Sequence, residues 1–307
     1  MHSEKPGTGR TALFFPLLLA LALLLQSCGN SENNVESMPN MLRVGVLPDD
    51  REEVLREQYT PLLDYLSTQL NVTYALIIPA DYQALLNQFV SGEIDLAYFG
   101  GFTFVKAHNL ANAVPLVMRD VDTRFTSYFI SSGKNPGKSF NDFKGSKFSF
   151  GSNLSTSGHL MPRFFLAENG INPETFFSEI LYSGSHDKTA YNVRDGIADI
   201  GAANSVIIDN MIEDGRLNRS DLKVIWETPP YPDYVWAAQA GLGRPALTKI
   251  RDAFMSISPS NKDHAAILKR LNAGGFLPAS VDDFKQLGEV GQQSGLLDET
   301  SGHERFK

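Results

Sequence analysis

Short apolar runs alternate with amphipathic segments along the first half of the chain. Residues 42–47 form an apolar run typical of a buried strand, which Pro48 ends. Residues 53–70 predict an amphipathic helix, because apolar side chains recur on one helical face. Further strands are predicted at 72–78, 94–99 and 114–118, with helices at 82–90 and 102–110. This alternation predicts a mostly parallel sheet with helices on both faces.

A second alternating series follows the β-rich run 125–131 and the loop 132–137. Strands are predicted at 147–150, near 180, at 197–202 and at 222–226, with helices beginning at 156, 186 and 205. The Pro-rich residues 228–232 interrupt this order, and residues 234–240 resume it as a strand. Closing helices are predicted from Pro245 to about 287, with Gly274-Gly275 between them.

The chain therefore passes twice between two α/β units, near 125–133 and near 227–237. This organisation predicts a bilobed α/β protein, two lobes joined by two hinge crossings with a ligand cleft between them. We assign residues 42–128 and 233–307 to the first lobe, and residues 129–232 to the second.

The two units share a weak internal sequence similarity. Residues 81–97 match residues 185–201 at a constant offset of 104, with Gly-x-x-Asp at the same place in both. The offset puts Tyr82 and His186 at equivalent helix starts, at the strand ends where open α/β sheets bind ligands. Convergent helix-stop chemistry would place the same glycines, so a true repeat remains one of two explanations.

The stretch from Gly151 to Gly158 carries three successive hydroxyls, Ser155, Thr156 and Ser157, between a predicted strand and a predicted helix. The first turn of a helix has unpaired N–H groups and a positive dipole end, so it attracts anions. The hydroxyls would add neutral donors to such a site. In the alternative interpretation, one of them is an ordinary N-cap and the others face solvent.

Four further residues are candidates for the same site. His186, in Ser185-His186-Asp187, opens a helix, where an imidazole can donate to an anion; a cap or surface role is the alternative. Tyr82 and Tyr98 offer phenolic donors unless they belong to the core. Asp233 would repel a fully ionised anion but accept a hydrogen bond from one that keeps a proton. That would favour hydrogen phosphate, phosphite or phosphonate over sulfate, whereas a plain turn Asp after Pro232 would do neither.

The first residues predict export from the cytoplasm. Lys5 and Arg10 precede the apolar run 12–25, which ends in Leu25-Gln26-Ser27-Cys28. This resembles a bacterial lipoprotein signal, which implies a signal peptide over 1–27 and lipid attachment at Cys28, the only cysteine. Residues 28–41, rich in Ser, Asn and Glu, predict a flexible tether. The net charge of −8 argues against nucleic acid and against an anionic membrane surface as partners.

Signals for catalysis are weak. There is no Gly-x-Ser-x-Gly elbow, and the six histidines show no metal-ligand spacing, so we expect no enzyme, metal or cofactor. A hydrolase that uses Ser155 as nucleophile and His186 as base remains an alternative.

Four motifs together resemble the phosphate/phosphite/phosphonate-binding proteins of ABC transporters, over about residues 42–290. They are Tyr98-Phe99-Gly100, Ser155-Thr156-Ser157-Gly158, Ser185-His186-Asp187, and Trp226 followed by Pro230-Tyr231-Pro232-Asp233. The resemblance implies the type II fold of periplasmic substrate-binding proteins. It implies that Ser155, Thr156, Ser157, His186 and Tyr82 hold the oxyanion, that Asp233 receives its proton, and that Tyr98 lines the cleft.

Two positions depart from that pattern. Phe125 stands where a Tyr is expected in phosphonate binders, and Val206 stands where aminoalkyl phosphonate binders tend to have an acid. The expected ligand is therefore phosphate, phosphite or a small alkyl phosphonate. We expect a monomer, held by its lipid on the periplasmic or extracytoplasmic side of a bacterial membrane, that serves an ABC permease. A sensor coupled to a histidine kinase is the alternative.

Overall fold

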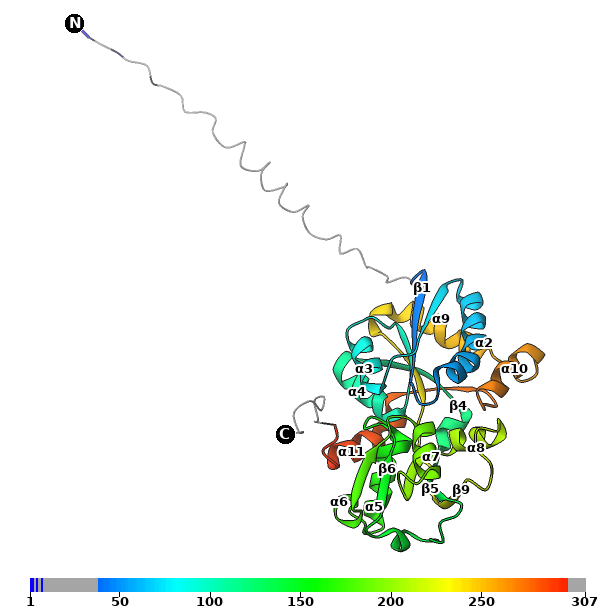
Figure 1. The fold of residues 1–307 in the computed structure, drawn as a ribbon. Coiled ribbons are helices and arrows are strands. Elements are labelled where there is room, and N and C mark those ends of the chain that lie inside the picture. The colour runs from blue at the N-terminus through cyan, green and yellow to red at the C-terminus, as the bar shows by residue number, and fades with distance from the viewer. Residues whose placement is uncertain (3, 5–6, 8–37, 298–307) are drawn as a thin grey trace. The chain divides into compact units, whose positions relative to one another are not determined.

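The structure is a computed structural model that describes residues 1, 2, 4, 7 and 38–297. The predicted signal peptide, Cys28 and most of the predicted tether lie outside the described residues, apart from these four near the start. Residues 36–307 form one compact unit, which contains every described strand and helix (Figure 1). None of the helices in the described part of the chain is both long and apolar enough to cross a membrane. The end of the predicted tether belongs to the fold, because Met38 packs on the core and Met41 begins the first strand.

The first lobe is built on a six-stranded sheet in the order β11-β4-β10-β3-β1-β2. Its strands are β1 (Met41–Val46), β2 (Thr73–Ile77), β3 (Leu96–Phe99), β4 (Val114–Arg119), β10 (Val235–Ala238) and β11 (Phe276–Pro278). Its helices are α2 (Glu52–Leu70), α3 (Tyr82–Val90), α4 (Gly101–Ala111), α9 (Gly243–Met255), α10 (Lys262–Arg270) and α11 (Lys285–Gln293). Helix α11 contacts α4 of this lobe and also α5 (Met161–Glu168) of the second lobe.

The second lobe is built on a five-stranded sheet in the order β7-β6-β8-β5-β9. Its strands are β5 (Ser127–Ser132), β6 (Lys147–Phe150), β7 (Glu179–Tyr182), β8 (Ile200–Asn204) and β9 (Leu222–Glu227). Its helices are α5 (Met161–Glu168), α6 (Pro173–Phe176), α7 (His186–Arg194) and α8 (Ser205–Glu213). Figure 1 shows this lobe in green, below the lobe that contains β1.

Both sheets are mixed, and in each of them most strands run in one direction, as predicted for the first lobe. β1 runs parallel to β2 and β3, and β6 parallel to β7 and β8, as helical crossovers require. β10 is antiparallel to β3, and β5 is antiparallel to β8. The reason is that β5 and β10 each enter a lobe through a hinge crossing, from the edge at which the parallel strands end.

The two hinge crossings lie side by side. Phe125 and Tyr231 form an isolated antiparallel bridge, in which each residue's N–H donates to the other's carbonyl at 2.8 and 3.0 Å. Strand β11 and the short helix α6 were not predicted. The short strand β11 follows Gly274-Gly275 in a region read as helical, and it is too short to show the alternation that identifies a strand.

Candidate functional site

The hydroxyls of residues 155–157 open a helix at the carboxyl end of β6. Ser155 is the N-cap, and its Oγ accepts a hydrogen bond from Gly158 N at 2.9 Å. The first turn, Thr156–Leu160, is π-helical, and α5 continues from it. All three residues are at most 2% exposed, so the alternative that placed hydroxyls in solvent is wrong.

The start of α4, from the first lobe, faces this helix start. Phe102 N donates to Thr156 Oγ1 at 3.0 Å, and Gly101 N donates to Asp233 Oδ1 at 2.9 Å. Because Thr156 Oγ1 accepts from Phe102, its own hydroxyl proton can go to a different acceptor. Two helix N-termini and a carboxylate thus meet where the lobes touch.

Tyr82 and His186 meet at the same place, as the offset of 104 predicts. Each is the first residue of its helix, α3 and α7 respectively. Tyr82 Oη lies 3.5 Å from His186 Nε2, and Ser155 Oγ lies 3.5 Å from the same nitrogen. The first lobe contributes the phenol, and the second contributes the imidazole and the hydroxyl.

The hydrogen bond on the far side of the ring determines what His186 offers. Asn204 N–H donates to His186 Nδ1 at 3.1 Å, so Nδ1 is an acceptor and the ring proton is on Nε2. Burial lowers the pKa of His186 to about 3, so the imidazole is neutral. It therefore presents an uncharged N–H donor toward Tyr82 and Ser155.

Two buried polar atoms here have no hydrogen-bond partner within residues 38–297. They are Ser157 Oγ and Asp233 Oδ2, and both residues are 1% exposed. A buried polar atom without a partner costs about 1 to 3 kcal/mol, so native proteins contain few of them. A hydroxyl donor beside a carboxylate acceptor suits a ligand that accepts one hydrogen bond and donates another.

The carboxyl of Asp233 has an unusual affinity for protons. Burial raises its pKa to about 7. The N–H of Gly101 opposes this rise, and so do the nearby hydroxyls of Thr156 and Ser157, although neither hydroxyl forms a hydrogen bond with Asp233 by distance and angle. The group thus exchanges a proton near neutral pH. It can hold the proton itself or accept a hydrogen bond from a ligand that holds one.

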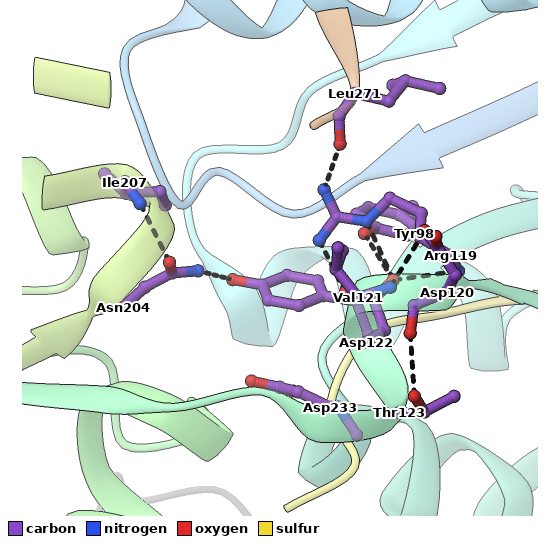
Figure 2. A network of polar contacts seen from close by, with 12 residues as sticks. Tyr98, Arg119, Asp120, Val121, Asp122, Thr123, Asn204, Ile207, Asp233 and Leu271 are labelled. Carbon is purple, nitrogen blue, oxygen red and sulfur yellow. Dashed lines mark hydrogen bonds and ion pairs between the residues drawn. The ribbon is translucent and has the colours of Figure 1, made fainter. Parts of the chain in front are cut away.

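Tyr98 lines a cavity of about 410 Å³ to which both lobes contribute. It stacks on Tyr234 with ring centroids 5.2 Å apart, and its Oη lies 3.4 Å from Asp122 Oδ2. Arg119 forms a two-pronged ion pair with Asp122 and donates to Leu271 O (Figure 2). Tyr98 therefore belongs to a buried ion-pair network. This network lies beside the hydroxyls of residues 155–157, which we call the hydroxyl cluster.

Three residues connect that cavity with the hydroxyl cluster. They are Asp49, Asn204 and Tyr234, and the sequence analysis did not single them out. Tyr234 Oη accepts from Asn204 Nδ2 and donates to Asp49 Oδ2, both at 2.9 Å (Figure 2 shows Asn204). Asp49 O accepts from His186 N at 3.1 Å. A signal for them existed, because Asp49 follows one strand and Asn204 ends another at the ligand-binding edge of each sheet.

The two positions that depart from the family pattern contribute apolar groups. Phe125 packs edge-on against Tyr234, with ring centroids 5.5 Å apart, and so offers no side-chain donor. Val206 lines the 410 Å³ cavity. The structure therefore places no carboxylate at position 206 to receive a ligand ammonium group.

The geometry argues against the hydrolase alternative. A serine nucleophile needs a base that turns a free lone pair toward its hydroxyl. Nε2 of His186 faces Ser155 but carries the ring proton, and a backbone amide rather than a carboxylate bonds Nδ1. Ser155 Oγ is in addition committed as the N-cap acceptor.

Comparison with known proteins agrees with this architecture. Residues 44–284 match the family described as ABC transporter, phosphonate, periplasmic substrate-binding protein. The chain is 33% identical to the probable ABC transporter phosphite binding protein PhnD1 of Prochlorococcus marinus, across 84% of this chain and 91% of that protein. It is 28% identical to the phosphate-import protein PhnD of Mycolicibacterium smegmatis, across 76% of this chain and 78% of that one.

The fold matches as well. The crystal structure of the Prochlorococcus PhnD1 in complex with methylphosphonate superposes with a TM-score of 0.79, covering 84% of this chain and all of that one at 31% identity. The predicted fold class and family are thus confirmed. The chain belongs to the family of periplasmic substrate-binding proteins of phosphonate ABC transporters, which bind their ligands and are not enzymes.

Proposed function

We propose that this protein captures phosphite, phosphate or methylphosphonate between its lobes and delivers it to an ABC permease. The observation that carries the proposal is the pair of buried, partnerless atoms, Ser157 Oγ and Asp233 Oδ2, among uncharged donors from both lobes. A tetrahedral oxyanion that keeps one proton would satisfy both atoms at once.

Each predicted site residue has a role in this proposal. The oxyanion accepts hydrogen bonds from Ser155, Thr156, Ser157, Tyr82 and His186, and Asp233 accepts the ligand's proton. Tyr98 lines the adjoining cavity and supports the wall of the site through its stacking on Tyr234. Because donors come from both lobes, binding would hold the lobes together.

Uncharged donors are sufficient for tight binding. Five or six hydrogen bonds to a charged oxyanion contribute about 1.5 to 3 kcal/mol each. Association and desolvation offset several to about 15 kcal/mol of that sum. Micromolar or tighter binding is therefore reachable without a lysine or arginine on the ligand.

The proposed ligands are small. The relatives carry names for phosphite and phosphate, and the matched crystal structure holds methylphosphonate, all tetrahedral phosphorus oxyanions with at most one methyl group. Val206 offers no counter-charge for an ammonium group. Sulfate has no proton for an ionised Asp233, so the site should reject sulfate above pH 7.

We also propose that the two lobes close against each other, the first lobe comprising residues 42–128 and 233–307 and the second comprising residues 129–232. A separate proposal is that a lipid on Cys28 anchors the mature chain. Sheet membership of the described strands supports the first point, and the Leu25-Gln26-Ser27-Cys28 sequence supports the second. Incorporation of labelled palmitate into the wild type but not into Cys28→Ser tests the anchor.

Isothermal titration calorimetry on residues 36–307 tests the binding function. We expect at least one of phosphite, phosphate and methylphosphonate to bind with micromolar or lower Kd, and sulfate to bind far more weakly. The double variant Ser155→Ala/Thr156→Ala should lose about 1 to 3 kcal/mol per donor. Equal affinity in this variant would show that the site has been assigned wrongly.

A further inference from the structure

One ion pair joins the lobes without touching the proposed ligand site. Arg216 Nη1 of the second lobe lies 2.6 Å from Asp50 Oδ1 of the first, and the two side chains are 9% and 6% exposed. Asp50 lies in the loop between β1 and α2, and Arg216 follows α8. Both line the 410 Å³ cavity rather than the hydroxyl cluster.

Each partner also has a contact inside its own lobe. Arg216 Nε donates to Asp214 Oδ2 at 2.7 Å, and Arg216 N donates to Asp214 Oδ1 at 3.1 Å, both inside the second lobe. Asp50 Oδ1 accepts from Arg51 N at 2.7 Å inside the first. Asp214 thus orients the guanidinium, and Nη1 of that guanidinium reaches Asp50 of the other lobe.

The loop that carries Asp50 also contacts the ligand site. Its neighbour Asp49 accepts from His186 N through its carbonyl and from Tyr234 Oη through its carboxylate. Pinning Asp50 to Arg216 therefore fixes the loop against the first residue of α7. The ion pair therefore acts on His186 through Asp49, the residue that precedes Asp50 in the chain.

We infer that Asp50 and Arg216 are a positioning pair that holds the closed lobes over the bound oxyanion and so sets the rate of ligand release. This inference rests on the proposed function. A buried charge that loses its partner is strongly disfavoured, whereas removing both charges together costs much less. Arg216→Gln leaves Asp50 without an ionic partner among the described residues, and Asp50→Asn leaves Arg216 with Asp214 alone. Each single substitution should therefore disfavour the closed arrangement, and the double substitution should recover part of the loss.

The test compares Asp50→Asn, Arg216→Gln and the double variant in residues 36–307. Stopped-flow dissociation of phosphate, phosphite and methylphosphonate gives the release rate, and thermal unfolding is measured in parallel. We expect each single variant to release ligand about tenfold faster or more, within the range of 5- to 150-fold typical of coupling between sites. The double variant should release ligand more slowly than the product of the two single effects predicts.

Asp95→Asn is the matched control. Asp95 forms an ion pair with Arg43 inside the first lobe, and its side chain is 9% exposed. This variant should lower the unfolding temperature and leave the release rate within twofold of wild type. Single variants at Asp50 and Arg216 that do the same, or whose effects multiply in the double variant, would overturn the inference.

A ligand-free measurement separates this inference from the proposed function. Leu110 and Ile197 are exposed, one in each lobe, and residues 36–307 contain no cysteine, so Leu110→Cys/Ile197→Cys accepts two spin labels. If the wild type binds none of the three anions, the proposed function fails and the distance between labels decides on the pair. A longer distance in both single variants supports the inference, and an unchanged distance overturns it.

Discussion

The backbone N–H of Asn204 donates to Nδ1 of His186 over 3.1 Å, inside the second lobe. This one contact sets the tautomer of the imidazole, because Nδ1 cannot accept and carry a proton at once. The donor that faces Tyr82 and Ser155 is therefore the Nε2–H group. A backbone amide cannot lose its proton in the physiological range, so the tautomer is independent of pH there.

His186 should not titrate between pH 5 and pH 8. Burial lowers its pKa to about 3, so the folded protein binds fewer protons at this site than the unfolded chain does. The stability that the neutral ring provides is therefore lost only as the pH falls from about 6.5 toward 3. Nitrogen-15 NMR of the histidine ring should show an acceptor Nδ1 and a protonated Nε2 with constant shifts. A titration midpoint near 6.5 would contradict the assignment.

Ser157→Ala should weaken oxyanion binding by about 1 to 3 kcal/mol while barely lowering stability, because Ser157 Oγ has no partner in the described protein to lose. Ser131→Ala is its control, since Ser131 Oγ is also buried without a partner but lies on β5. Calorimetry should show a loss for the first variant and none for the second. Equal losses, or none in either, would remove Ser157 from the site.

Asp233→Asn should stabilise the ligand-free protein at high pH. The folded-state pKa of Asp233 is raised to about 7, so its contribution to stability is full below about pH 4 and is lost as pH rises through 7. Asparagine does not ionise. The substitution should therefore raise the free energy of unfolding by roughly 1 to 4 kcal/mol at pH 8 and by close to nothing at pH 4. Urea unfolding at the two pH values measures it, and a pH-independent difference would contradict the raised pKa.

The same substitution should relax selectivity against sulfate. In the proposed site a carboxylate faces the ligand, whereas the amide of Asn can donate to an unprotonated oxygen. Asp233→Asn should therefore narrow the ratio of phosphate to sulfate affinity by about tenfold or more, a change of about 1.4 kcal/mol. Competition binding at pH 8 measures the ratio, and unchanged discrimination would leave Asp233 without a role in ligand choice.

Gly158→Ala should displace two of the proposed ligand-binding side chains and so weaken binding. An added Cβ at this position would lie 2.9 Å from Cε1 of His186, closer than real Cβ contacts come, and 3.0 Å from Ser155 Oγ, tighter than most such contacts. The two groups must move apart, so affinity should fall by tenfold or more. Gly196→Ala in the same lobe is a control for general destabilisation, because it meets no atom within 4 Å but is strained by its positive φ. It should lower stability without changing affinity.

The parts of the site that sequence revealed are those with a local signal. Ser155 to Ser157 follow a strand and open a helix, and the 104-residue offset predicts that Tyr82 and His186 stand at equivalent positions. Their meeting at 3.5 Å follows from the way in which two similar α/β units face each other. Local patterns therefore predicted these helix-start residues, whereas Asp49 and Asn204, which also stand at strand ends, were missed.

The remainder depended on tertiary packing. Nothing near Asn204 in the sequence shows that its amide determines a histidine tautomer, and Asp50 has no local feature that points to Arg216, 166 residues away. Which strands run antiparallel escaped prediction for a related reason. The direction of β5 and β10 is set by the edge at which the chain enters each lobe, not by their apolar pattern.

The most direct test is a crystal structure of residues 36–307 grown with phosphite or methylphosphonate. It should place one oxyanion between the lobes within hydrogen-bond distance of Ser155, Thr156, Ser157, Tyr82 and His186 Nε2, with a ligand oxygen facing Asp233 Oδ2. An anion bound in the cavity beside Asp50, or hydroxyls of residues 155–157 that make no contact with it, would contradict the account.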